Sequence, residues 1–176
     1  MTEPVFACRM HNAHVLKRVV QALREMITEA NFDCTSTGMQ LQAMDESHTC
    51  LVIVDLQKEG FEEYACDTLL SLGLNIDHFK KLLEPVEPGS AMELRVWEPQ
   101  EVLAMRILGA EGGPEVVRWD MNLIDIDAEH MCVPDDEYQV IFSMDAHELF
   151  RICSSNADLA DSLTIDVGQA GGAGAG

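Results

Sequence analysis

The sequence predicts an α+β fold, and two observations lead to that class. Short segments of strand character follow one another along most of the chain, each bounded by polar or Gly- and Pro-containing turns. Helical segments interrupt them, so that a strand–turn–helix unit recurs weakly at 5–30, 69–84 and 138–155. Strands and helices of this number in a chain of 176 residues indicate one ordinary domain or two small ones.

The first unit contains a strand at 5–10 and a long amphipathic helix at 14–30. Its apolar residues recur at helical spacing and define one buried stripe: Leu16, Val19, Val20, Leu23, Met26, Ile27 and Ala30. Lys17 and Arg24 lie on the opposite side, and Arg18 flanks them. Such a polar side is usually a solvated face. It also suits contact with duplex phosphates without base readout, because it is positive and lacks aromatic residues.

Four strands follow, at 32–36, 39–44, 50–56 and 62–67, and a polar turn at 45–48 joins the second to the third. Val52, Ile53 and Val54 make that third strand apolar on both faces, which predicts that both faces are covered. Met44, just before the turn, is either a core residue or an adaptable contact for a partner, and the core reading is favoured.

A strand at 69–75 leads to Asp77, which can cap a helix at 78–84 that carries Lys80 and Lys81. Strands at 92–98, 101–110 and 115–123 follow. Because the alternation slips by one residue at Ile124, the last of them is expected to end or bulge there.

The remaining segments are less regular. Six acids and no Lys or Arg occupy 125–137. A strand at 138–144 leads to a capping box, Asp145 with Glu148, and to a helix that carries Arg151. A last strand is expected at 162–167, and the Gly/Ala-rich tail at 168–176 is expected to be flexible.

Composition excludes several classes. A net charge of −20 argues against nucleic-acid binding as a whole, yet six of the eleven basic residues lie on predicted helices. No apolar run is long enough for a membrane span. The six cysteines form no C-x-x-C pair and are expected to be buried reduced thiols. Nucleophile-elbow, P-loop and zincin motifs are absent, and the acids at 125–137 lack the spacing of an EF-hand calcium site. His11 and His14 lie on either side of the predicted strand–helix junction, so solvated histidines are favoured over a pair of metal ligands. We therefore expect neither an enzyme nor a cofactor nor a metal.

Two stretches resemble eukaryotic sliding clamps, the proliferating cell nuclear antigen (PCNA) family. In the first, the residues in register with the family pattern are Asp33, Ser36, Gly38, Leu41, Gln42, Met44, Asp45, Ser47, His48, Leu51 and Val52. In the second they are Cys66, Asp67, Gly73, Asn75, Lys81 and Leu82, whereas Ala65, Thr68 and Glu84 stand where the family often has Arg or Lys. Residues 137–155 are similar to the start of the family's second domain.

The resemblance implies a DNA-clamp fold with helices on one face of curved antiparallel sheets. It implies a clamp N-terminal domain at 1–122, an interdomain connector at 123–137 and the start of a C-terminal domain at 138–167, so that the second domain is truncated. The implied function is that of a nuclear processivity factor in replication and repair. Its partners would be duplex DNA, a replicative polymerase, a clamp loader and repair proteins that carry peptide motifs.

The resemblance also implies three sites. The DNA-binding residues would be Lys17, Arg18, Arg24, Lys80, Lys81 and Arg151. The partner-peptide groove would comprise Met44, His48, Thr49, Met131, Val133 and Pro134, unless these residues only pack the connector onto the first domain. The subunit interface would comprise Val116, Val117, Trp119 and Met121 on an edge strand.

The family forms homotrimers, but the partner strand of that interface lies past residue 176, so we predict that this chain cannot close the usual ring. The alternative function is an acidic protein-interaction module that binds clamp partners and cannot encircle DNA.

Overall fold

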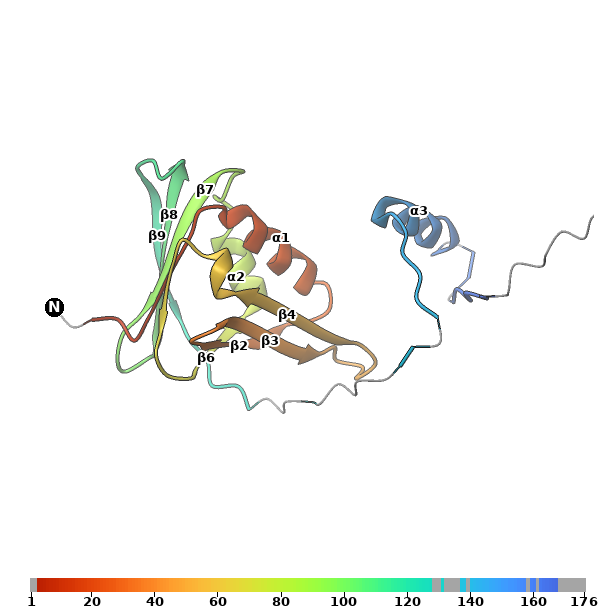
Figure 1. Cartoon of the computed structure of the whole chain (residues 1–176), viewed down its shortest axis with the longest axis horizontal. Helices are drawn as coiled ribbons and strands as arrows, with labels where there is room; N and C mark the ends of the chain where they lie inside the picture. The colour runs from red at the N-terminus through yellow and green to blue at the C-terminus, as the bar shows by residue number, and fades with distance from the viewer. Residues whose placement is uncertain are drawn as a thin grey trace, which may run out of the picture. The chain divides into compact units, whose positions relative to one another are not determined.

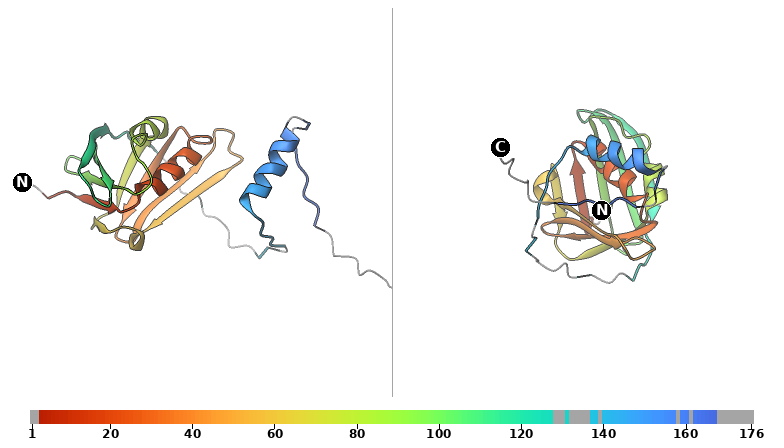
Figure 2. Two further views of the ribbon diagram at one scale, coloured as in Figure 1. Left: turned by 90° about the horizontal axis from the view of Figure 1, so that it is seen from above. Right: turned by 90° about the vertical axis from the view of Figure 1, so that its right-hand side faces the viewer.

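The computed structural model describes residues 3–127, 131, 137–138, 140–157, 159–160 and 162–167. The chain divides into two compact units, Met1–Met131 and Cys132–Gly176. Each is described by itself. The first carries two antiparallel sheets and two helices, and the second carries one helix (Figures 1 and 2).

The chain passes several times between the two sheets of the first unit. In chain order they are β1 (Phe6–Met10), α1 (Ala13–Leu23), β2 (Glu29–Thr35), β3 (Gly38–Met44), β4 (Leu51–Gln57), a 3-10 turn η1 (Lys58–Gly60), β5 (Glu63–Cys66), β6 (Leu70–Asn75), α2 (Ile76–Leu82), β7 (Ser90–Val96), β8 (Val102–Ala110) and β9 (Glu115–Asn122). The five-stranded sheet has the order β5-β1-β7-β8-β9, and the four-stranded sheet has the order β4-β3-β2-β6. The α+β prediction is confirmed.

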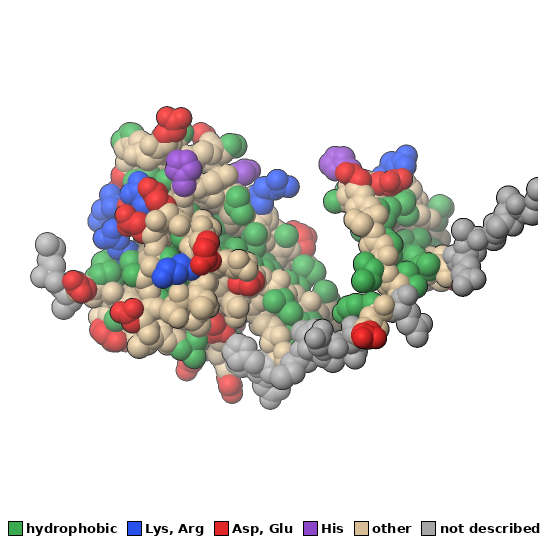
Figure 3. Space-filling model, in the orientation of Figure 1, with side chains coloured by type: hydrophobic (Ala, Val, Ile, Leu, Met, Phe, Trp, Pro, Cys, Tyr) green, Lys and Arg blue, Asp and Glu red, His purple; other side chains and the backbone are tan. Residues whose placement is uncertain are grey.

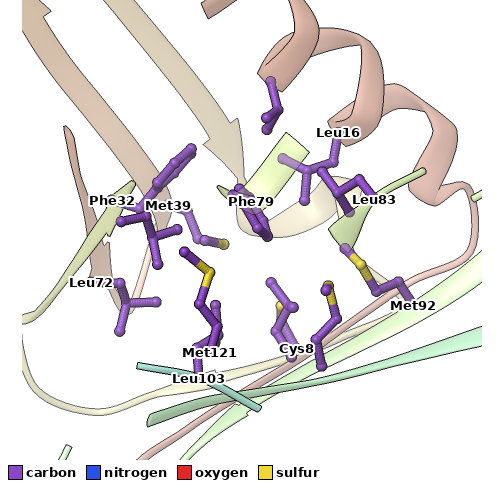
Figure 4. Packing of buried hydrophobic residues seen from close by; sticks show 14 of the residues in the cluster. Cys8, Leu16, Phe32, Met39, Leu72, Phe79, Leu83, Met92, Leu103 and Met121 are labelled. Carbon is purple, nitrogen blue, oxygen red and sulfur yellow. The ribbon is translucent and has the colours of Figure 1, made fainter. Parts of the chain in front are cut away.

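One core fills the space between the two sheets and the two helices (Figure 4). Cys8, Met92 and Leu103 reach it from the five-stranded sheet, and Phe32 and Leu72 reach it from the four-stranded sheet. Leu16 on α1 and Phe79 on α2 close it, and both side chains are almost fully buried. Their periodic apolar residues place α1 and α2 over this core and leave the opposite side of each helix polar.

The first helix is shorter than the sequence predicts. It ends at Leu23 and not near residue 30, and β2 begins at Glu29. Ala30, expected on the helical stripe, stands opposite Leu74 in the ladder between β2 and β6. A buried Ala30 fits the apolar pattern of a helix and that of a strand equally well. Pairing of β2 with the distant strand β6 makes it part of a strand.

The prediction that β4 is covered on both faces is wrong. Val52, Val54 and Leu56 pack against the core, whereas Ile53 on the other face remains 55% exposed. β4 is an edge strand, paired only with β3 among the strands that the structure describes. The apolar run therefore reflects an outer face that no other element of this unit covers.

The second unit contains α3 (Ala146–Ala157). Asp145 caps it by accepting from the backbone N–H of His147 at 2.8 Å and of Glu148 at 3.3 Å, which confirms the predicted start. The strands predicted at 138–144 and 162–167 are wrong where these residues are described, because they form no ladder. A strand is stable only with a neighbour to accept and donate its hydrogen bonds. The tail at 168–176 lies outside the described residues.

The predicted end of the last strand of the first unit is confirmed. β9 stops at Asn122, two residues before the slip at Ile124, and Leu123 donates its N–H to the carbonyl of Glu101. The domain limits at 122 and 137 stay predictions.

Candidate functional site

Lys17 on α1 and Arg24 directly after it tie this helix to α2. Arg24, which follows the last residue of α1, donates from Nε to Asp77 Oδ1 in the first turn of α2 at 2.8 Å. Lys17, two turns earlier, donates from Nζ to the carbonyls of Glu84 and Val86, just past α2, at 2.8 and 2.7 Å. Arg24, at the end of α1, thus contacts the first turn of α2, and Lys17, nearer the start of α1, contacts the segment directly after α2. The two helices therefore lie side by side in opposite directions (Figure 1).

The other predicted DNA contacts of the first unit come from the same helices. Arg18 and Lys81 are exposed and Lys80 is half-buried. We call Lys17, Arg18, Arg24, Lys80 and Lys81 the helix-pair cations. Arg151 belongs to the second unit, where its Nη2 lies 4.0 Å from Glu148 Oε1.

The helix-pair cations are not equally available to a ligand. The side-chain hydrogen bond from Arg24 lowers the pKa of the Asp77 carboxyl, and Asp77 in turn raises the pKa of Arg24. Arg24 also lies 3.2 Å from Glu25. Because Arg24 faces two carboxylates and Lys17 two carbonyls, Arg18 and Lys81 are the better candidates to meet phosphates.

The turn at 45–48 is organised by one carboxylate. Asp45 Oδ1 accepts from the backbone N–H groups of Thr49 and Cys50, each at 2.8 Å, and Asp45 Oδ2 accepts from the Ser47 hydroxyl. These hydrogen bonds, that from Ser47 first, lower the pKa of Asp45 well below its usual range. They hold His48 in a left-handed conformation with φ of 54°. The turn next to the predicted groove is therefore held by hydrogen bonds to a single side chain.

The segment after β9 is hydrogen-bonded to the four-stranded sheet at Ile124, Ile126 and Met131, and we call these described residues of the segment the strap. Ile124 donates its N–H to the carbonyl of Gly73 on β6 at 2.9 Å. Asn31 on β2 donates from Nδ2 to the carbonyl of Ile126 at 2.9 Å. Gln42 on β3 pairs with the backbone of Met131 in both directions, at 2.7 and 2.8 Å. Because β6, β2 and β3 are neighbours in the sheet, the contacts of Ile124, Ile126 and Met131 follow the order of the strands.

A cavity of about 370 Å³ lies where this strap meets the turn. We call it the strap pocket; its lining residues are Glu29, Ala30, Asn31, Gln42, Ala43, Met44, His48, Leu51, Ile126, Asp127 and Met131. Its volume is within the range of ordinary ligand sites. Met44, Leu51, Ile126 and Met131 give it an apolar lining, and Glu29 and Asp127 give it negative charge.

The strap pocket brings together three of the predicted groove residues, Met44, His48 and Met131. Thr49 does not line it; its hydroxyl bonds to Ser47 and Asp45 within the turn. Val133 and Pro134 lie outside the described residues. Asn31 and Gly73 anchor the strap and were not predicted to do so, although an Asn within a strand that is otherwise half apolar is a visible signal.

The predicted interface strand is an edge, as expected: β9 pairs with β8 and with no other described strand. Val116 is 57% exposed and Trp119 37% exposed, and Val117 is half-buried. Met121 is the exception. It is 8% exposed and belongs to the core, so its side chain is not free for a second subunit.

A cluster of arginines that the sequence did not reveal covers the outer face of the five-stranded sheet. Glu93, 7% exposed, binds Arg9 at 3.1 Å, Arg95 at 3.2 Å and Arg106 at 2.9 Å. Glu115 binds Arg106 at 2.7 Å and Arg118 at 3.2 Å. Figure 3 shows Lys and Arg side chains gathered with acidic ones over these strands. Four of the eleven basic residues are therefore engaged here.

Reactive groups are few in the part of the chain that the structure describes. No group of three or more His, Cys, Asp or Glu side chains there could hold a metal ion, and no helix there could span a membrane. The five described cysteines are free. Cys8, Cys34 and Cys66 are buried as expected, and burial raises the pKa of Cys8 to about 12, whereas Cys50 and Cys153 are exposed, contrary to expectation.

Comparison with known proteins gives one consistent answer. The family described as proliferating cell nuclear antigen, N-terminal domain, matches residues 5–131. The proliferating cell nuclear antigen of Chaetomium thermophilum is 34% identical over 163 residues, which cover 93% of this chain and 62% of the relative. The crystal structure of the proliferating cellular nuclear antigen from Entamoeba histolytica superposes with a TM-score of 0.83 at 27% identity, over 90% of this chain and 63% of that one. The chain thus spans less than two thirds of the length of these relatives.

Proposed function

Because the chain belongs to the PCNA family, we propose that it acts as a DNA sliding clamp, which holds duplex DNA without reading its sequence and docks peptides of replication and repair proteins. PCNA proteins are clamps and not enzymes, so the chain is not an enzyme. Processivity on DNA, a nuclear location and assembly with a polymerase and a clamp loader are part of the proposal.

The strap pocket is the observation that carries this proposal. Its wall is held in place by the contacts of Ile124, Ile126 and Met131 with three successive strands, so the site is formed before a partner arrives. The apolar floor fits an aromatic or aliphatic side chain, and Glu29 and Asp127 favour basic residues beside it. A short peptide with an apolar anchor and basic flanks is the ligand that this chemistry selects.

The helix pair supports the DNA part of the proposal. In a chain with a net charge of −20, cations on the polar side of adjacent helices are the surface to which phosphates would be attracted. Arg18 and Lys81, exposed and on different helices, supply positive charge that phosphates can meet. This composition suits loose contact with the duplex backbone.

Peptide binding to the intact chain tests the first part. A fluorescent peptide with an aromatic anchor and basic flanks should bind with saturable anisotropy, and Met44→Glu should weaken that binding at least about tenfold, because it places a carboxylate in the apolar pocket. Val102→Glu is the matched control, since Val102 is an exposed apolar residue of the other sheet. Equal binding by both variants would remove the strap pocket from the proposal.

One observation favours the alternative, an acidic protein-interaction module. Two of the helix-pair cations, Lys17 and Arg24, are held by groups of the chain itself. Retention on closed circular against linear duplex separates the two functions. Retention that is lost when the circle is cut supports a clamp, and peptide binding without DNA retention supports the module.

A further inference from the structure

The outer face of the four-stranded sheet, which points away from the core, carries a second cavity that the peptide site described above leaves unused. Its volume is about 410 Å³, and Gln40, Ile53, Asp55 and Leu69 are among its lining residues. We call it the far hollow. Ile53 and Asp55 alternate on β4 with Val52, Val54 and Leu56, which pack against the core, so both point outward.

The far hollow and the strap pocket lie on opposite sides of the strap. On β3, residues 42–44 line the strap pocket and residues 40–42 line the far hollow. The two cavities share Gln42 and Met131, the two residues through which the strap is hydrogen-bonded to β3. A peptide seated in the strap pocket therefore reaches the far hollow by passing over the strap at Met131.

The β4 end of the far hollow combines an exposed apolar side chain with an available acid. Ile53 lies directly opposite Gln42 in the ladder and is 55% exposed. Asp55 is exposed, and no residue that the structure describes forms an ion pair or a side-chain hydrogen bond with it. Two residues apart on one face of a strand, the two side chains are separated by about 7 Å. The aliphatic stem and the charged end of an arginine or a lysine span such a distance.

We propose that the far hollow binds a basic side chain of the same peptide whose apolar anchor fills the strap pocket. The stem of this side chain lies on Ile53 and Met131, and its charged end meets Asp55. The inference rests on the proposed peptide site and adds a second contact to it. No Lys or Arg is among the described residues that line the far hollow, so the charge of the hollow favours a cation. Because the peptide backbone passes over the strap, only a long side chain reaches the sheet.

The strands set the distance between the two contacts. In the ladder between β3 and β4, Gln40 lies opposite Asp55, and Met44, which lines the strap pocket, lies four residues further along β3. Four residues of a strand span about 13 Å. An extended peptide covers that length with about four residues. The basic residue is therefore expected about four positions from the apolar anchor, on one side of the anchor only.

A series of fluorescent peptides, titrated against the intact chain and followed by anisotropy, tests the proposal. Each peptide carries one aromatic anchor and a single arginine, which is moved through successive positions on either side of the anchor. The peptide with arginine about four positions away should bind at least about fivefold more tightly than the same peptide with alanine there. Ile53→Ser and Asp55→Asn should each remove most of this advantage.

Matched controls come from the edge strand of the other sheet. Val116, 57% exposed on β9, is the counterpart of Ile53, and Asp120, exposed on the same strand, is the counterpart of Asp55. Val116→Ser and Asp120→Asn should leave the affinity for every peptide unchanged.

A reversal of charge separates the pairing of Asp55 from general effects. Asp55→Lys should weaken binding of the arginine peptide and favour the peptide with glutamate at the same position, because the opposite charges again face each other. Added salt should reduce the contribution of Asp55 and leave that of Ile53, because screening acts on the charges and not on the apolar contact.

The outcomes distinguish this inference from the peptide site on which it rests. Binding that Met44→Glu weakens, but that depends neither on the position of the arginine nor on Ile53 and Asp55, would overturn the far hollow and leave the strap pocket in place. If none of the peptides binds with saturation, both proposals fail together.

Discussion

At the scale of single residues, Glu93 is the charge on which the outer face of the five-stranded sheet depends. Three arginines from β1, β7 and β8 meet its two oxygens while its side chain is nearly excluded from water. Without this carboxylate, Arg9 and Arg106 would repel each other and lose acceptors. Replacing Glu93 with Ala is therefore expected to cost about 2–4 kcal/mol of unfolding free energy.

Urea unfolding followed by circular dichroism measures that loss. Glu62→Ala is the matched control, since Glu62 contacts Arg9 alone at 2.8 Å and is 49% exposed. Its expected cost is about 0–1 kcal/mol, as for a surface ion pair. Equal costs for the two variants would mean that the arginine cluster adds no stability beyond single pairs.

Asp45 gives the second prediction at this scale, and its sign follows from the direction of its pKa shift. Hydrogen bonds from Ser47, Cys50 and Thr49 lower the pKa of Asp45 in the folded chain. Its contribution to the turn is then fully present above the pKa of the unfolded chain, about 3.9 for an ordinary Asp, and is lost as pH falls through the lowered folded value. The amide resonances of Thr49 and Cys50 should stay unchanged through about pH 3.9 and move only in stronger acid. In Asp45→Asn that acid transition should be absent.

The sequence reveals these two residues unequally. Asp45 stands in a polar turn between two apolar runs, so its place is visible from local pattern alone. Glu93 and Arg9 are 84 residues apart, and they meet because β1 and β7 pair in a register that places them opposite each other. No local pattern contains that register, and the arginine cluster could not be predicted.

At the scale of elements, pairing between distant strands decides some boundaries that the local apolar pattern predicts wrongly. The apolar residues continue at helical spacing up to Ala30. The helix nevertheless ends earlier, because residues Glu29 to Cys34 pair with β6 at six positions. The end of β9 was predictable, because the apolar alternation slips there. The exposure of the Ile53 side chain was not predictable. Its strand is apolar on both faces, and only the neighbouring strands decide whether such a strand is central or at an edge.

Gly73 is the element-scale test of the strap. A Cβ at this position on β6 would lie 1.9 Å from the carbonyl oxygen of Ile124, so the two cannot coexist. Gly73→Ala should therefore detach the start of the strap at Ile124 and weaken peptide binding, because Ile126, two residues on, lines the strap pocket. Anisotropy with the same peptide measures the loss, expected to be about tenfold.

A control must separate the strap from general damage to the fold. Gly38→Ala places a Cβ 2.3 Å from the carbonyl oxygen of Leu56 and strains a backbone with φ of 148°, also within the four-stranded sheet. It should lower the unfolding temperature with less effect on peptide affinity at temperatures where the chain is folded. If Gly73→Ala lowers both in proportion, the strap has no separate role in binding.

At the scale of the whole molecule, residues shared with the PCNA family predicted the fold better than the composition of the chain did. The stretches around residues 33–52 and 66–82 indicated the family, and with it the antiparallel sheets and the helix pair. Net charge alone would have argued against DNA. The sequence could not show how the basic residues are divided. Four are engaged on the outer sheet face, and Lys17 and Arg24, on and directly after α1, are held by α2 and the residues after it.

That division leads to the last prediction. If phosphates bind at the helix pair, Asp77 competes with DNA for Arg24, which it holds at 2.8 Å. Asp77→Asn removes the competing carboxylate, frees the guanidinium and adds one unit of positive charge at the surface that would face the duplex. Affinity for duplex DNA should rise a few-fold, and the slope of log K against log salt should steepen by about 0.9, the value for one further neutralised phosphate. Glu111→Gln removes one acid from the β8–β9 turn and should alter neither quantity. Titrations at several salt concentrations distinguish the outcomes: an unchanged slope with Asp77→Asn would mean that Arg24 serves only to join α1 to α2, and that DNA, if bound, lies elsewhere.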